Sequence, residues 1–157
     1  LEGRDVSEFR EGPSRLFLAP DPEVLREARC RLRPPARYAD VPFVIRQTAR
    51  FPIAAPHDGR VFRNSLLAGF ESSPWTAPVL IGLLNSTLLR SLHLCARRDA
   101  RQRSFPQVKV GHLRALPAPP FEELRAQQLT HLVRALFMSP ASRELRLELD
   151  AAGRNKP

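Results

Sequence analysis

Two clusters of arginine and glutamine have the residue types and spacing best suited to binding a ligand. One lies after a long apolar stretch and comprises Arg97, Arg98, Arg101, Gln102 and Arg103. The other comprises Arg46, Gln47, Thr48 and Arg50, with Arg60 and Arg63 expected opposite them across a hairpin. A guanidinium group suits both phosphate oxygens and guanine edges, and glutamine beside arginine can contact bases. With Lys109, these clusters predict a DNA-binding surface.

Basic charge is concentrated in the middle of the chain. The net charge is +9, but arginine outnumbers lysine 23 to 2, and a GC-rich genome produces that bias in any protein. Residues 1–40 hold eight arginines and eight acids, whereas residues 41–120 hold eleven basic residues and three acids. Residues 121–157 are nearly balanced, with six basic and five acidic residues. Codon bias does not remove carboxylates from one block, so the middle is typical of a surface that faces a polyanion.

Each basic cluster also has an ordinary structural explanation. Arginines at the end of a helix suit its dipole, so the cluster after residue 96 could be a solvated helix terminus. The residues near the hairpin could form a solvated basic face. Trp75 and Phe105 could stack on bases, although core packing is the more common role of such side chains.

The sequence lacks the usual signatures of a catalytic centre. Its seven glycines are too scattered to form a dinucleotide-binding or phosphate-cradling loop. No Cys, His or carboxylate spacing is typical of a metal site, and Lys109 has no carboxylate nearby. A Ser–His–Asp arrangement stays open because its members can be distant in sequence, but no serine lies in a nucleophile-elbow motif. We therefore expect no catalytic residue, metal or cofactor in this chain, with His57, His93, His112 and His131 as core or surface residues.

Strands and helices that could position these residues follow from the apolar pattern. Residues 43–49 are rich in β-formers, with Phe43 and Ile45 on one face and Val44 on the other. An Asp58-Gly59 turn is expected to lead into a partner strand at 61–63. Residues 66–70 and 105–110 are expected to form further strands. Helical spacing predicts helices at 22–28, 76–95, 121–137 and 142–152.

These elements predict an α+β fold: a small mixed or antiparallel sheet packed with a long buried helix and a C-terminal amphipathic helix. Sixteen prolines argue against a helical bundle because proline interrupts helices. We expect one domain over residues 1–138 and a helical tail over 139–157. The chain opens without methionine, which suggests a piece of a longer protein.

Cysteine content and hydropathy suggest the compartment. Cys30 and Cys95 are far apart and show no disulfide framework, which favours a reducing, cytoplasmic setting. The most apolar run, residues 77–95, contains Arg90 and several polar residues, so a buried core helix is expected rather than a membrane span.

Five short motifs, in order, resemble the TaqI-like C-terminal specificity domain, the target-recognition module of adenine-specific DNA methyltransferases and type IIG restriction-modification enzymes. The motifs are Val44-Ile45-Arg46-Gln47-Thr48, Asn64-Ser65-Leu66, Leu83-Leu84-Asn85-Ser86, Phe105-Pro106-Gln107-Val108-Lys109 and Leu116-Pro117-Ala118-Pro119. The helix expected at 121–137 is similar to the element that closes related domains in type I specificity subunits. The similarity covers most of residues 1–138.

The resemblance implies sequence-specific recognition of double-stranded DNA in the major groove. A separate, covalently linked catalytic domain would bind S-adenosylmethionine, flip the adenine out of the helix and methylate it. The Asn-Pro-Pro-aromatic and glycine-rich motifs of that catalytic domain are missing here, so this chain would not bind the cofactor. In such families Asn85-Ser86 and Phe105-Pro106 would be scaffold rather than base contacts.

One alternative function belongs to another class. The chain could be a basic protein-interaction scaffold that docks on a partner subunit through the 121–137 helix. Salt dependence distinguishes the two, because each phosphate contact contributes about −0.9 to the slope of log affinity against log salt.

Overall fold

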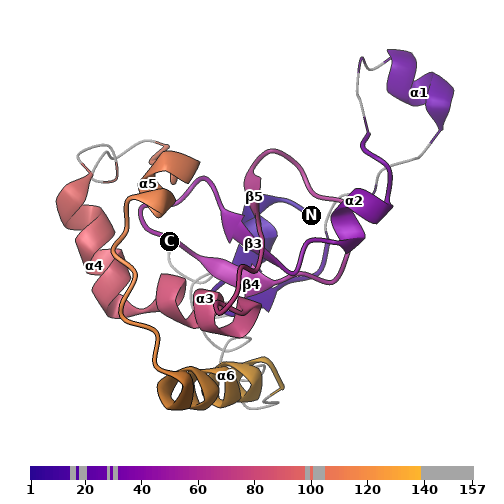
Figure 1. Cartoon of the computed structure of the whole chain (residues 1–157). Helices are drawn as coiled ribbons and strands as arrows, with labels where there is room; N and C mark the ends of the chain where they lie inside the picture. Colours follow the sequence, from indigo (N-terminus) through magenta and orange to yellow (C-terminus); the bar gives the residue numbers. More distant parts are fainter. Residues whose placement is uncertain are drawn as a thin grey trace, which may run out of the picture.

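The chain has an α+β fold built on two small antiparallel sheets. A computed structural model describes residues 1–14, 17, 21–27, 29, 32–97, 100 and 105–138. In chain order the elements are the 3₁₀ turn η1 (Gly3–Asp5), β1 (Val6–Ser7), β2 (Arg10–Glu11), α1 (Pro22–Glu27), α2 (Ala36–Ala39), β3 (Phe43–Arg46), β4 (Ala54–Pro56), β5 (Leu66–Gly69), α3 (Ala77–Asn85), α4 (Thr87–Ala96), α5 (Val110–Arg114) and α6 (Glu123–Met138). Figure 1 shows α1 set apart from the other elements.

Strand β3 is the centre of the main sheet, whose order is β4-β3-β5. Both neighbours are antiparallel to it, with Val44 opposite Ala55 on one side and Ala68 on the other. Phe43 lies opposite Gly69, and a side chain at position 69 would overlap the Phe43 ring. Glycine is therefore needed there so that the aromatic ring can lie across the neighbouring strand.

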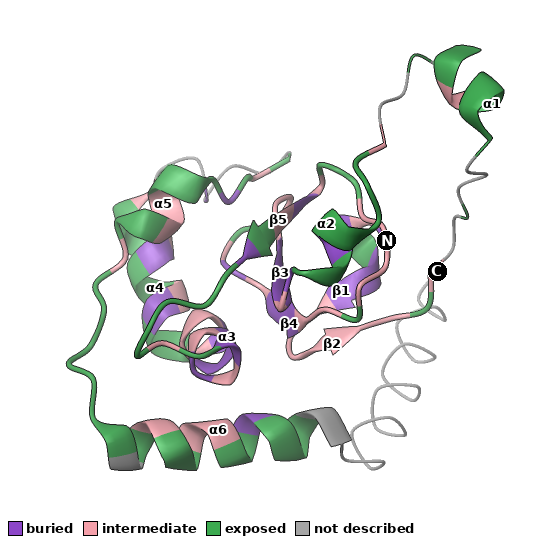
Figure 2. Ribbon diagram, turned by 45° about the vertical axis from the view of Figure 1, so that its right-hand side comes forward, coloured by how far each residue is buried: buried purple, intermediate pink, exposed green. Residues whose placement is uncertain are grey.

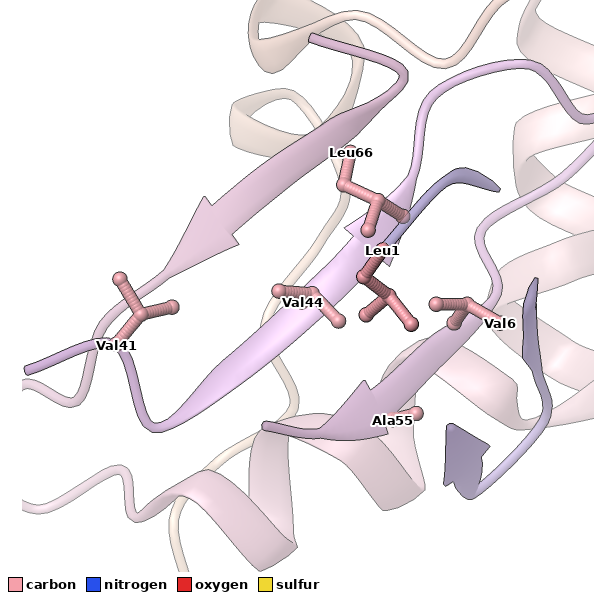
Figure 3. Packing of buried hydrophobic residues seen from close by; sticks show 6 residues of the cluster. All are labelled: Leu1, Val6, Val41, Val44, Ala55 and Leu66. Atoms are coloured by element: carbon pink, nitrogen blue, oxygen red, sulfur yellow. The ribbon is translucent and has the colours of Figure 1, made fainter. Parts of the chain in front are cut away.

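The sheet buries both of its faces. Val44 and Ala55 pack with Leu1, Val6 and Leu66, so that the N-terminal segment covers one face (Figure 3). Phe43 and Ile45 pack on the other face with residues of α3 and α6, among them Ile81 and Val133. The predicted alternation along this strand is confirmed. Because both faces of the strand are buried, its residues before Arg46 are all apolar.

Helix α6 packs on α3. Its inner residue Val133 is 1% exposed, and Leu129 lies over Gly82, where a Cβ would come within 2.8 Å of Leu129 Cδ1. The small residue thus lets the two helices approach closely. Figure 2 shows the side of α6 that faces away from α3 as exposed.

The expected long helix is two helices that meet at 60°. Ser86 between them is extended (φ −67°, ψ 144°), and its Oγ donates to the Leu83 carbonyl and accepts from Leu89 N–H. Serine competes with the helix backbone in this way, which ends α3 and caps α4. Within the described residues no single helix is long and apolar enough to cross a membrane, although the bent pair together has a span's length and composition.

Two predicted strands are wrong. Residues 61–63 form no strand, because Arg63 N–H donates to the Leu1 carbonyl instead of to a hairpin partner. Gly59 does have the positive φ (86°) expected of the Asp-Gly turn. Residues 105–110 contribute one isolated bridge, between Gln107 and Thr48, and then enter α5. The tail at 139–157 lies outside the described residues.

The side chain of Asn85 fastens the end of α3 to β4. It is 7% exposed, its Nδ2 donates to the Ala54 carbonyl (2.8 Å), and its Oδ1 accepts from Ala54 N–H (3.0 Å). The Ala54 carbonyl also accepts from Phe9 N–H, so the N–H of Ala54 depends on Asn85 far more than the carbonyl does. The scaffold role expected of Asn85 agrees with these contacts.

Replacing Asn85 with leucine should destabilise the fold without changing side-chain size greatly. A buried N–H left without a partner costs about 1–3 kcal/mol, so the free energy of unfolding in urea should fall by about that amount. Asn64→Leu is the matched control, because Asn64 is exposed and the change should stay within about 0.5 kcal/mol. Equal stability of the two variants would contradict this role of Asn85.

Candidate nucleic-acid interface

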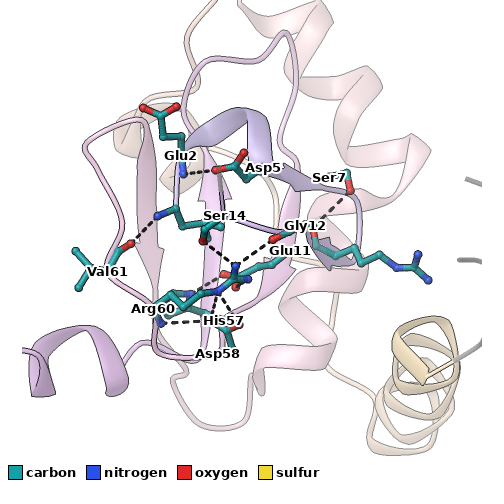
Figure 4. A network of polar contacts seen from close by, with 12 residues as sticks. Glu2, Asp5, Ser7, Glu11, Gly12, Ser14, His57, Asp58, Arg60 and Val61 are labelled. Atoms are coloured by element: carbon teal, nitrogen blue, oxygen red, sulfur yellow. Dashed lines mark hydrogen bonds and ion pairs between the residues drawn. The ribbon is translucent and has the colours of Figure 1, made fainter. Parts of the chain in front are cut away.

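Arg60 lies in a network that joins the N-terminal hairpin to the loop after β4 (Figure 4). Its Nη2 contacts Glu11 Oε2 (2.8 Å), its Nε contacts Asp58 Oδ2 (2.7 Å), and its Nη1 donates to the Gly12 carbonyl and Ser14 Oγ. Every nitrogen of the guanidinium is therefore engaged within the protein. We leave Arg60 out of the DNA-binding surface, although its sequence position suggested it.

The same network contains three side chains that could in principle hold a metal ion. Ligand atoms of Glu11, His57 and Asp58 lie within 4.8 Å of one another, and His57 Nδ1 is 2.5 Å from Glu11 Oε1. The guanidinium of Arg60 already contacts both carboxylates, and its positive charge would repel a second cation there. His57 also packs edge-to-face on Phe62 (5.2 Å between ring centres), so we assign the cluster a structural role.

The ionisation of the network follows from its contacts. Partial burial alone would raise the pKa of the Asp58 carboxyl, but the hydrogen bonds from Arg60 outweigh it and hold that pKa below its usual value. The hydrogen bond to Asp58 in turn raises the pKa of Arg60 above its already high value, despite the opposing effect of burial. Both shifts favour the charged pair.

Other arginines of the central block also contact N-terminal carboxylates. Arg63 Nη1 is 2.8 Å from Glu2 Oε1, and Arg90 Nη1 is 3.0 Å from Glu8 Oε1. Arg90 is held further by Pro52, by Asn85 and by the ring of Phe51, 4.7 Å from its guanidinium carbon. Arg63 is still 68% exposed, and such a surface pair is weak, so Arg63 remains available to a ligand.

The chain from Arg46 to Arg50 leaves β3 beside residues 105–109. Thr48 forms a β-bridge with Gln107, and Val108 N–H donates to the Gln47 carbonyl (2.7 Å). Gln47 N–H donates to the Ser65 carbonyl (3.0 Å), so this backbone is held from both sides. Residues 46–50 and residues 105–109, which include the predicted Lys109, thus lie side by side where the central strand ends, and we call this surface the edge.

Most accessible side chains on this edge are polar or basic. Arg50 is exposed and Gln47 is half-buried, and neither side chain has a partner within the described part of the chain. Lys109 and Gln107 are also exposed. Arg97 is half-buried at the end of α4, and Arg98, Arg101, Gln102 and Arg103 lie outside the described residues.

Phe105, which the sequence suggested could stack on bases, belongs to this edge, and so does Gln107, which the sequence analysis did not propose as a binding residue. Phe105 is 83% exposed, which corrects the expectation that it packs in the core, whereas Trp75 is half-buried and packs edge-to-face on the ring of Phe121 (5.2 Å). The φ of Phe105 is +50°, a conformation rare for aromatic residues and more common at functional sites. Gln107 lies two residues from Lys109, much as Gln47 lies next to Arg46. This pairing of an amide with a basic residue is the sequence signal by which Gln107 could have been found.

No protein-family model, curated protein or solved structure matches the chain. Function must therefore be inferred from the residues and geometry of this edge.

Replacing Asp58 with asparagine should lower the free energy of unfolding at neutral pH. The variant should also lose less of that free energy than the wild type when the pH is lowered. A carboxyl whose pKa is lower in the folded state stabilises the fold above its unfolded pKa of about 3.9 and loses that contribution as pH falls through the folded value. Because Asp58 is 56% exposed, the effect should be at most about 1 kcal/mol.

The measurement is the free energy of unfolding in urea at pH 7 and at pH 3. The difference between wild type and Asp58→Asn should be present at pH 7 and shrink at pH 3. Asp40→Asn is the control, because Asp40 is exposed and has no side-chain ion pair within the described residues. A difference that persists unchanged at pH 3 would refute the proposed contribution of the Asp58 charge.

Proposed function

We propose that this chain recognises specific sequences in double-stranded DNA, as the specificity domain of an adenine-specific DNA methyltransferase or a fused restriction-modification enzyme. The observation that carries the proposal is the bridge between Thr48 and Gln107, which places the 46–50 and 105–109 segments side by side. Two amides, Gln47 and Gln107, lie there among Arg46, Arg50 and Lys109. Amides can pair with base edges while cations hold phosphates, and recognition needs both.

The proposal assigns the chemistry to another part of the parent protein. A covalently linked methyltransferase domain would bind S-adenosylmethionine and methylate the adenine, and this chain would select the site as a non-catalytic module. The natural setting is the bacterial cytoplasm, where the DNA substrate is found and the exposed thiol of Cys95 would stay reduced.

A docking scaffold is the second candidate, and one observation favours it. Leu132 (60% exposed) and Leu136 (45% exposed) are one helical turn apart on α6. This apolar pair suits a partner subunit or the linked catalytic domain. Docking through α6 would not involve the edge at Thr48 and Gln107, so the two functions are separable by mutation.

Gln47 and Arg50 should have different effects on DNA binding. If Arg50 holds a phosphate, Arg50→Gln should weaken binding to all duplexes and reduce the magnitude of the log–log salt slope by about 0.9. If Gln47 contacts a base, Gln47→Ala should keep the slope and reduce the preference for the selected sequence by about 1–3 kcal/mol.

The target is found first, by selecting bound duplexes from a randomised pool, and affinities are then measured by fluorescence anisotropy at several salt concentrations. Arg125→Gln on α6 is the matched control for charge, because its exposed pair with Glu122 contributes little. A pool with no enriched motif would refute sequence recognition. Equal salt slopes for Arg50→Gln and Arg125→Gln would refute the assigned surface.

A further inference from the structure

A small open pocket lies beside the proposed DNA-binding edge, between the N-terminal turn and the end of β3. Its volume is about 230 Å³, and its lining comes from segments far apart in sequence: Glu2, Gly3, Arg4, Arg46, Thr48 and Ser65. A single water needs only about 10–15 Å³, so the pocket has room for a hydrated oxyanion. From its donors we propose that this pocket binds one phosphate group.

The pocket is fixed by a close approach of two backbones. Gly3 N–H donates to Ser65 Oγ (2.9 Å), and a Cβ on Gly3 would lie 2.9 Å from the Ser65 carbonyl oxygen. Only glycine allows this distance without a shift of the backbone. The N-terminal turn, which includes Arg4, is thus held against the start of β5.

Hydrogen-bond donors predominate among the unused groups of the lining. Arg46 Nε donates to the Thr48 carbonyl (2.9 Å), which orients the guanidinium, while its Nη1 and Nη2 have no partner within the described residues. Ser65 Oγ accepts from Gly3, so its own proton is available, and the Thr48 hydroxyl has no partner in the described part of the chain. Guanidinium and hydroxyl donors converging on one pocket suit phosphate oxygens, which only accept.

The acidic residue in the lining does not cancel this charge. Glu2 Oε2 contacts Arg4 Nη2 and Glu2 Oε1 contacts Arg63 Nη1, both at 2.8 Å, so the carboxylate is already paired on each oxygen. Asp5 lies behind it, with Oδ2 accepting from Glu2 N–H. Three guanidinium groups thus face two carboxylates, and Arg46 is the one without an ion pair within the described residues.

The phosphate could come from the DNA backbone or from free phosphate, and the position favours DNA. Arg46 immediately precedes Gln47 on the edge proposed to contact bases, so a phosphodiester in the pocket would set the position of the duplex against that edge. This choice of source depends on the proposed function, whereas the phosphate site itself does not.

The first test is an NMR titration of the full chain with inorganic phosphate. Saturable amide shifts are expected at Gly3, Thr48 and Ser65. Thr48→Val removes one donor at almost constant shape, and Arg4→Gln removes an exposed one, so neither should unfold the chain. Both should weaken phosphate binding several-fold, whereas Arg125→Gln on α6 should not. Absence of saturable shifts in the wild type, or unchanged binding by both pocket variants, would overturn the site.

The second test uses a DNA duplex and separates the two sources. If the pocket holds a backbone phosphate, Arg46→Gln should reduce the magnitude of the salt slope by about 0.9 and phosphate should compete with the duplex. If the duplex binds with an unchanged slope in Arg46→Gln, DNA is not the source, and the proposal of a backbone phosphate is wrong. If phosphate binds and the duplex does not, the proposed function fails while the phosphate site stands.

Discussion

Charge compensation by the N-terminal segment is the constraint on which the remaining surface depends. Glu2, Glu8 and Glu11 lie within the first eleven residues and contact Arg63, Arg90 and Arg60, which are respectively 61, 82 and 49 positions further along the chain. Arg60 and Arg90 are largely buried, and without such a partner each would be costly because a charge loses its hydration there, whereas the exposed Arg63 needs its partner less. The balanced composition of the N-terminal segment therefore serves the fold, and it reduces the positive charge left for a ligand.

The basic residues of the edge that are not paired with N-terminal carboxylates are held in position by backbone contacts. The Thr48–Gln107 bridge and the Gln47–Val108 hydrogen bond join the end of the central strand to the segment before α5. Side chains that recognise bases must be held in a defined register, and a backbone fixed from two sides provides it. The edge thus combines charge, amides and one exposed aromatic ring on a rigid base.

Local sequence patterns predicted the elements whose signal is local. The β-formers at 43–46, the Asp58-Gly59 turn and the apolar periodicity of α6 all led to the observed structure. The break at Ser86 was not predictable from periodicity, because the apolar spacing continues through it and serine alone does not end a helix. The absence of a strand at 61–63 depends on the contact of Arg63 with Leu1, which no local pattern reveals.

The site was predicted only in part for the same reason. Arg60 looked like a ligand-binding residue because its neighbour Asp58 is its only nearby acid, whereas its main anchor, Glu11, is 49 residues away. Gln107 was missed, and Phe105 was expected in the core, because the exposure of both residues depends on the path of the chain around the bridge with Thr48. Residue types suggested which side chains could bind a ligand, but they could not reveal which of them pair with distant residues of the chain.

We propose that residues 46–50 and 105–109 form one DNA-binding edge. Cross-linking with a duplex that carries 5-bromodeoxyuridine, followed by mass spectrometry of the peptides, tests it most directly. Cross-links are expected to peptides from both segments, with Phe105 a favoured position, and none are expected to α6. Cross-links concentrated on α6, or spread evenly over the chain, would contradict it.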